Sequence, residues 1–183
     1  TSATAGTGVT GGQAGAIIGD SNSASSFNGT GTGLAVANGS QVGPDAFSVE
    51  AWFNSTSTAG GKIIGFGAAN TGNSSSYDRQ VYLDNTGRVT FGVYPNAVRT
   101  VTSPKTYADG QWHHVVASLG SGGMTLYVDG LKVGARTDTT FGQAYTGYWR
   151  IGGDNLGGWP NQPSSNYLNG LIVRRGAALG VAT

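Results

Sequence analysis

The stretch from Tyr107 to Gly134, YADGQWHHVVASLGSGGMTLYVDGLKVG, constrains the fold of this chain more than any other. It predicts three consecutive antiparallel strands joined by glycine-containing turns, over residues 112–119, 124–128 and 131–135. The second turn, Asp129-Gly130, suits a type I′ hairpin, in which both central residues need a positive φ. Apolar and polar residues alternate along the middle strand, so one face of this meander is apolar. Such a face is stable in water only when a second sheet covers it.

Short alternating runs recur along the rest of the chain. The clearest is Ala46–Asn54, in which Phe47, Val49, Ala51 and Phe53 share one face. Turn residues, among them 33 glycines, separate these runs, and no segment has the period of an amphipathic helix. The pattern predicts an all-β fold, an antiparallel two-sheet β-sandwich or jelly roll.

Length and composition favour a single domain. A chain of 183 residues with 38% apolar residues is long enough to bury one core. Residues 1–12 are rich in Thr, Ser and Gly and are interpreted as a linker, and Ala14–Gly19 as the first strand. The predicted division is therefore a linker over 1–12, one domain over 13–175 and a C-terminal tail over 176–183.

The charge and cysteine content exclude several classes of function. A net charge of +1 does not favour a nucleic-acid or polybasic membrane-binding surface. No apolar run approaches the length of a membrane span, so we expect no membrane insertion. The absence of cysteine excludes disulfides and thiol-bound zinc.

Residues suited to catalysis are sparse. Glycoside hydrolysis needs two carboxylates flanking the scissile bond, and Glu50 is the only glutamate, with no acidic cluster on one strand. His113 and His114 are adjacent in a strand, so their side chains face opposite sides and cannot chelate one metal together. We expect no enzymatic activity.

Three stretches together resemble a known family: FSVEAWF (residues 47–53), DGQWHHVVASLGSGGMTLYVDGLKVG (109–134) and YWRIGGDNLGGWPNQPSSNYLNGLI (148–172). They are similar to the laminin G-like branch of the concanavalin A-like lectin/glucanase superfamily, and most similar to bacterial members from secreted or surface proteins. The resemblance implies a jelly roll with one concave face. It also implies an extracellular, non-catalytic module that is monomeric within a multidomain chain and binds a glycan or a surface protein.

A bound Ca²⁺ is common in this family. Its members usually have an acidic pair after the closing strand, whereas here Gly170-Leu171-Ile172 runs into Val-Arg-Arg. The remaining oxygen-rich turns contain the candidate ligands Asp20 and Asn22, and Asp154 and Asn155. The alternative is that these residues form Asx-turns with their own backbone.

A sugar site requires an aromatic side chain that stacks on the ring and planar polar groups that bond its hydroxyls. The candidates are Trp52, Arg79, Tyr82, Trp159 and Asn161. Trp159 lies in a Gly/Pro/Asn-rich loop, where it either faces a ligand or plugs one end of the sandwich. Trp52 lies among polar residues and is either covered or offered to a ligand.

Two functions remain open from the sequence. The first is carbohydrate recognition, and the second is an adhesive or spacer role that involves a protein ligand or none. A hydrolase is the third and least favoured class. A carbohydrate-binding module should keep an exposed tryptophan in a groove, whereas a spacer should bury all four of its tryptophans.

Overall fold

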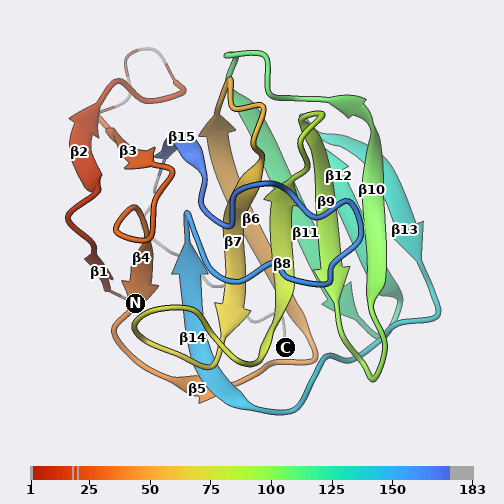
Figure 1. Cartoon of the computed structure of the whole chain (residues 1–183). Helices are drawn as coiled ribbons and strands as arrows, with labels where there is room; N and C mark the ends of the chain where they lie inside the picture. The colour runs from red at the N-terminus through yellow and green to blue at the C-terminus, as the bar shows by residue number, and fades with distance from the viewer. Residues whose placement is uncertain (1, 18, 20, 174–183) are drawn as a thin grey trace.

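Two antiparallel sheets lie face to face in the computed structural model, which describes residues 2–17, 19 and 21–173 (Figure 1). The front sheet of Figure 1 has the strand order β1 (Ala3–Ala5), β4 (Ala35–Ala37), β14 (Thr146–Ile151), β7 (Gly61–Gly67), β8 (Tyr77–Leu83), β9 (Arg88–Val93) and β10 (Arg99–Thr106), and β5 (Gln41–Val42) also pairs with β14. The back sheet has the order β13 (Leu131–Arg136), β12 (Gly123–Val128), β11 (His113–Gly120), β6 (Phe47–Asn54), β15 (Asn169–Val173), β3 (Ala24–Asn28) and β2 (Val9–Gln13). The described residues form no helix, and therefore none that could cross a membrane.

The core lies between the two sheets, as the alternation of the strands requires. The four apolar residues of β6 that were predicted to share a face, Phe47, Val49, Ala51 and Phe53, are all buried. Phe47 meets Trp149 of the front sheet with ring centroids 5.5 Å apart. The predicted all-β sandwich is therefore confirmed, and Trp149 belongs to its core.

The predicted meander forms one half of the back sheet. β11 pairs with β12 and β12 with β13, in agreement with the three strands expected from the sequence. Asp129 and Gly130 have φ values of 52° and 77°, which confirms the type I′ requirement of the turn between β12 and β13. β11 also pairs with β6, so the meander continues into the centre of the sheet.

The N-terminal segment adds a strand to each sheet, which corrects the prediction that residues 1–12 are a linker. β1 pairs with β4, and β2 pairs with β3. Edge strands bond through the backbone on one side only, so a polar sequence without an apolar face can form them. The prediction of a strand at residues 14–19 is wrong for the described residues of that range, since β2 ends at Gln13 and residues 14–17 and 19 form no strand. Residues 176–183, the predicted tail, lie outside the described residues.

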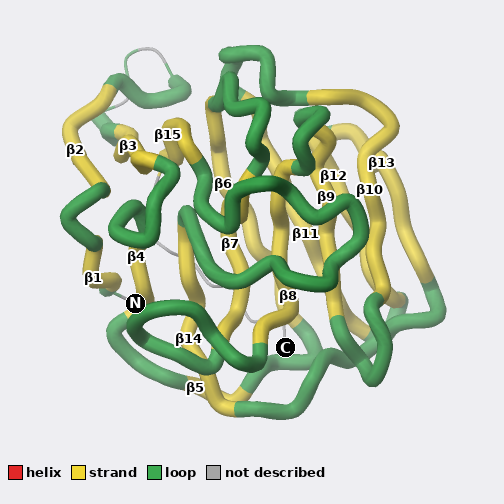
Figure 2. The backbone as a smooth tube through the Cα atoms, in the orientation of Figure 1, coloured by secondary structure: helices red, strands yellow, loops and turns green. Residues whose placement is uncertain are grey.

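A long loop between β14 and β15 covers the outer face of the front sheet. Figure 2 shows this loop crossing in front of β7, β8 and β9. The outer face of the back sheet has no equivalent cover from this loop. Within residues 2–173, this loop therefore limits access to the outer face of the front sheet.

Candidate functional site

Arg79, one of the predicted sugar-binding residues, is fully buried. Its guanidinium pairs with the Asp78 carboxylate at 2.7 Å and the Asp45 carboxylate at 3.4 Å, and donates to the backbone carbonyls of Pro44 and Gln143. β8 has one more residue than β7 across this stretch, and Arg79 adopts a φ of 45° in the resulting bulge. The prediction is therefore corrected, because Arg79 holds two loops against β8 and does not face solvent.

Trp159 and Tyr82 are also buried, against each other and Leu156 on the outer face of the front sheet. Trp159 is 5% exposed, and the Tyr82 hydroxyl donates to the Pro160 carbonyl at 2.6 Å. A Cβ on Gly92 would lie 2.3 Å from the Trp159 ring, so β9 has a glycine where the indole rests. Of the two alternatives for Trp159 the structure shows burial, although the residue covers a sheet and does not plug an end. Neither aromatic residue can stack on a sugar.

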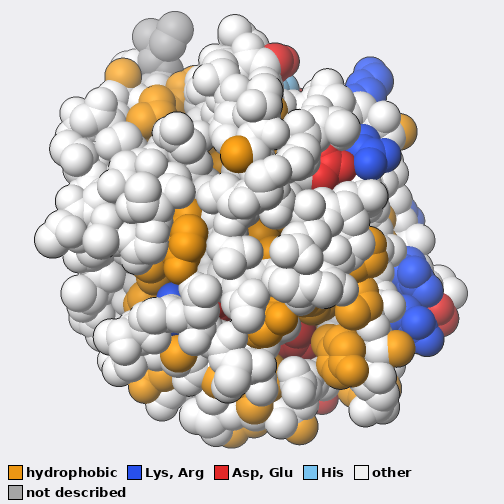
Figure 3. Space-filling model, in the orientation of Figure 1, with side chains coloured by type: hydrophobic (Ala, Val, Ile, Leu, Met, Phe, Trp, Pro, Cys, Tyr) orange, Lys and Arg blue, Asp and Glu red, His pale blue; other side chains and the backbone are white. Residues whose placement is uncertain are grey.

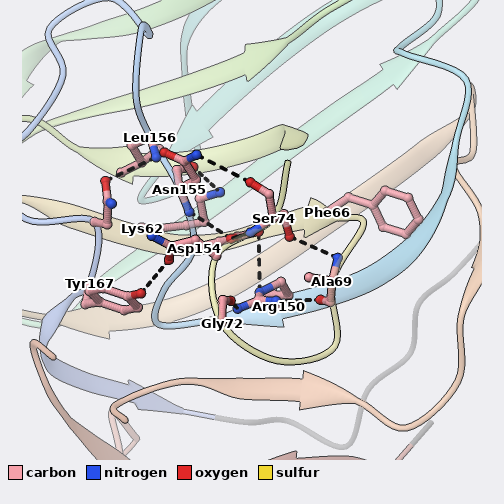
Figure 4. Close-up of polar contacts among 12 residues, drawn as sticks. Lys62, Phe66, Ala69, Gly72, Ser74, Arg150, Asp154, Asn155, Leu156 and Tyr167 are labelled. Carbon is pink, nitrogen blue, oxygen red and sulfur yellow. Dashed lines mark hydrogen bonds and ion pairs between the residues drawn. The ribbon is translucent and has the colours of Figure 1, made fainter. Parts of the chain in front are cut away.

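Asp154 lies in a buried cluster of charges under the same loop (Figure 4). One oxygen of its carboxylate accepts hydrogen bonds from the backbone N–H groups of Ser74 and Asn155, both at 2.8 Å. The other oxygen lies 3.4 Å from Nε of Arg150, which is itself fully buried. The ammonium of Lys62 donates to the Asn155 carbonyl at 3.0 Å.

This cluster does not fit a calcium site. Ca²⁺ requires six to eight oxygen ligands, whereas the Asp154 carboxylate is already shared between two N–H donors and a guanidinium. The Asn155 side chain bonds the Ser74 carbonyl and the Gly157 N–H, as an Asx-turn does. No three His, Asp or Glu side chains form a metal cluster in the described part of the chain. Asp20 lies outside the described residues, so calcium at Asp20 and Asn22 stays a prediction.

Burial lowers the pKa of Lys62 to about 8, and the attraction of Asp154 only partly offsets this effect. The unfolded chain keeps the lysine proton up to its ordinary pKa of 10.5, so between these values the unfolded state binds more protons than the folded state. The free energy of unfolding should therefore rise by roughly 1–2 kcal/mol between about pH 7.5 and about pH 9.5. Urea titrations across this range test it.

Lys62→Met should remove this rise, whereas Lys105→Met, at an exposed position, should keep it. The titrations stop near pH 9.5 because the protein has buried tyrosines with raised pKa values, such as Tyr82. At higher pH these tyrosines ionise in the unfolded state but not in the folded state, which lowers the free energy of unfolding. A flat profile in the unmodified protein would contradict a charged, desolvated Lys62.

His113 and His114 face opposite sides of β11, as predicted. His113 points inward at the edge of the core, with Nδ1 2.8 Å from Asp129 and Nε2 3.0 Å from Asp109. Burial alone would lower the pKa of His113, but the two carboxylates outweigh it and raise the pKa. His114 lies on the outer face of the back sheet, where its ring stacks on Trp52 with centroids 4.9 Å apart.

A cavity of about 450 Å³ opens on the outer face of the back sheet, where β6 ends. Its floor is a row of directly paired residues, Ser26, Leu171 and Asn54, from β3, β15 and β6. Its walls are the segment 55–59 and Asn169. We call this cavity the β6 pocket. Its volume is within the usual range for small-molecule sites.

Hydrogen bonds hold the walls of the β6 pocket in place. The Ser55 hydroxyl donates to the Asn169 carbonyl at 2.7 Å and accepts from the Ser57 N–H, and the Ser57 hydroxyl accepts from the Ala59 N–H. The Asn54 side-chain amide donates to the Gly110 carbonyl at 2.7 Å. The pocket is therefore formed before any ligand arrives, which reduces the entropy cost of binding.

Several polar groups of the β6 pocket have no partner among the described residues. They are the side-chain oxygen of Asn54, the side-chain amide of Asn169 and the hydroxyls of Thr56 and Thr58. Trp52 lies two residues before Asn54 on the same strand face, about 7 Å away, and is partly exposed. Unpaired amides and hydroxyls beside an aromatic ring are the groups that a sugar requires.

Of the predicted sugar-binding residues, Trp52 and Asn161 reach the surface. Asn161 lies in the loop over the front sheet and Trp52 on the back sheet, so the structure does not bring them together. The β6 pocket was missed, although its signal is present in the run Asn-Ser-Thr-Ser-Thr that follows the aromatic end of β6. Asn169 could not be found from the sequence, because only strand pairing brings β15 beside β6.

Comparison with known protein families identifies the fold. The laminin G family model described as "Concanavalin A-like lectin/glucanases superfamily" matches residues 27–174, most of the chain. The chain belongs to the concanavalin A-like lectin/glucanase superfamily. The match confirms the resemblance seen in the three sequence stretches. A search of curated proteins returns no match.

Several solved structures share the fold at low sequence identity. A heptameric SAP-like pentraxin from Limulus polyphemus is 20% identical with a TM-score of 0.59, covering 83% of this chain and 73% of that one. Domains LG4-5 of the mouse laminin alpha1 chain are 18% identical with a TM-score of 0.57, covering 86% of this chain and 41% of theirs. Domain 4 of an extracellular arabinanase from Geobacillus stearothermophilus, solved with arabinotriose, is 18% identical with a TM-score of 0.54, covering 93% and 81%.

Proposed function

We propose that this chain is a non-catalytic carbohydrate-binding module. The observation that supports the proposal is the β6 pocket, in which the unpaired side-chain groups of Asn54, Thr56, Thr58 and Asn169 lie beside Trp52. A sugar offers several hydroxyls to amides and hydroxyls of this kind, and its apolar ring face to an aromatic side chain.

The comparisons support the same class of function. The arabinanase domain with the same fold was solved with arabinotriose bound, and its parent enzyme is extracellular. We infer an extracellular location for this chain as well, as part of a larger secreted or surface protein. The proposed absence of catalysis rests on the lack of acidic residues among the described residues of the pocket lining, since hydrolysis of a glycosidic bond needs two carboxylates.

Isothermal titration with neutral and acidic oligosaccharides, arabinotriose among them, tests the proposal. At least one should bind saturably with one site per chain. Replacing both Thr56 and Thr58 with valine should weaken that binding about tenfold, because each change removes a hydroxyl with no other partner. The matched control replaces Thr137 and Thr140, exposed threonines beyond β13, and should bind as the unmodified protein does. If no oligosaccharide binds, the adhesive or spacer role is favoured.

A further inference from the structure

The charges around the β6 pocket define the class of sugar that it accepts. None of the described residues that line the pocket is charged. The side-chain groups left without partners are amides and hydroxyls, which can donate to and accept from hydroxyls without a net charge. A carboxylated or sulfated sugar would therefore find no cation in the pocket lining to compensate its charge.

Among the described residues, the charged groups near the pocket and near Trp52 are mainly carboxylates. Glu50 lies two residues before Trp52 on the same strand face, and its side chain is 58% exposed. Asp109 precedes Gly110, whose carbonyl holds the Asn54 amide, and its side chain is 54% exposed. His113 bridges Asp109 and Asp129, so this group keeps a net negative charge even when the imidazole is protonated.

The lysines and arginines of residues 2–173 lie elsewhere, and Arg174 and Arg175 lie outside the described residues. Lys62, Arg79 and Arg150 are fully buried beneath the front sheet's loops. The remaining described cations, Arg88, Arg99, Lys105, Lys132 and Arg136, are on β9, β10 and β13. Figure 3 shows Lys and Arg side chains gathered at the edge formed by β10 and β13. In Figure 1, β3 and β15, which contribute to the pocket, lie toward the opposite edge of the sandwich.

Trp52 extends the site along β6. Its indole is held on one side by the His114 ring, at an interplanar angle of 28°, and the Glu50 carboxylate is 3.6 Å from His114. The His114 ring and the Glu50 carboxylate therefore restrain each other beside the indole. This contact limits the conformational entropy that the protein would lose when a sugar stacks on Trp52. A ligand that fills the pocket therefore has an aromatic surface beside it for a second ring.

We infer that the β6 pocket selects a neutral sugar residue over an acidic one, with Trp52 stacking on the ring next to it. This inference rests on the proposed carbohydrate-binding function. The uncharged hydrogen-bonding groups of the pocket lining, the carboxylates near the pocket and Trp52, and the positions of the described cations favour ligands with hydroxyls over ligands with a carboxylate.

Titrations with matched tetrasaccharides test the selectivity. The probes are neutral chains of glucose, galactose, xylose or arabinose and the uronic acid chains that match the glucose and galactose ones. We expect a neutral chain to bind and its uronic counterpart to bind at least about tenfold more weakly at low ionic strength, with the difference shrinking in salt. Equal or tighter binding of the uronic chain would overturn the inference while leaving the proposed function in place. If none of the oligosaccharides binds, both the inference and the proposed function are overturned.

Variants of Asn169 and Trp52 locate the site. Asn169→Ala and Trp52→Ala should each weaken the neutral chain about tenfold, and Asn169→Lys should raise the affinity for the uronic chain by placing a cation at the pocket. Asn70 provides the matched control, since it is an exposed asparagine in the β7–β8 loop. Asn70→Ala and Asn70→Lys should change neither affinity. Neutral binding that survives both Asn169→Ala and Trp52→Ala would place the site elsewhere and overturn the inference.

Discussion

Trp159→Ala should destabilise the protein and leave its sugar affinity unchanged. The indole is 5% exposed and packs with Tyr82 and Leu156 over the front sheet, so its removal leaves a cavity under the loop. Large-to-small changes of this kind cost about 3–5 kcal/mol. For a chain of this size, that corresponds to a fall in melting temperature of about 6–20 °C. Scanning calorimetry measures this shift.

The contrast with Trp52 separates packing from binding. Trp52→Ala changes a partly exposed side chain on the outer face of the back sheet, and should lower the melting temperature far less than Trp159→Ala. Glycan affinity, measured well below the melting temperature of each variant, should show the reverse order. If Trp159→Ala abolished binding in a protein that still melted normally, the loop over the front sheet would have to contain the ligand site.

Asp154→Ala should cost a similar amount of stability for an electrostatic reason. The change leaves the buried Arg150 guanidinium and Lys62 ammonium without their counter-ion and leaves the Ser74 N–H without its acceptor. Removing one partner of a buried ion pair costs about 3–5 kcal/mol, because an uncompensated charge stays in a region of low dielectric constant. Urea unfolding at neutral pH measures the loss.

Two further variants identify the cause. Asp138→Ala breaks the exposed pair with Arg136 and should change the midpoint of unfolding little, because both groups stay solvated. Lys62→Met in the Asp154→Ala background should recover part of the loss, since it removes one of the uncompensated cations. Equal losses in Asp154→Ala and Asp138→Ala would show that the cluster does not stabilise the fold through its charges.

Much of the fold could be predicted from the sequence because strand patterns are local. The alternation in Phe47–Phe53 and the Asp129-Gly130 turn define a buried face and a hairpin without reference to the rest of the chain. β1 and β2 escaped prediction because an edge strand in a polar segment has no apolar alternation to reveal it.

The candidate site could be predicted only in part. Trp52 was found, because a tryptophan on the polar face of a strand is unusual and its face follows from alternation alone. Arg79 was misplaced because a bulge in β8 breaks that alternation, and Trp159 because burial of a loop residue depends on which surface the loop covers. The carboxylate of Asp154 and the amide of Asn155 match a calcium pattern in the sequence. The structure places buried cations beside them, Arg150 at Asp154 and Lys62 at Asn155.

The sequence by itself determined the class of fold, the meander and the family, because these depend on alternation, turn chemistry and motif order along the chain. Only the tertiary structure decided which polar residues are free to bind. Asn54 and Asn169 are 115 residues apart and meet because β15 inserts between β3 and β6, whereas Asp154 and Arg79 are consumed by partners from other strands and loops. A polar side chain is free to bind a ligand only when neighbouring residues do not already satisfy its hydrogen bonds. In a β-sandwich most of those neighbours are distant in sequence.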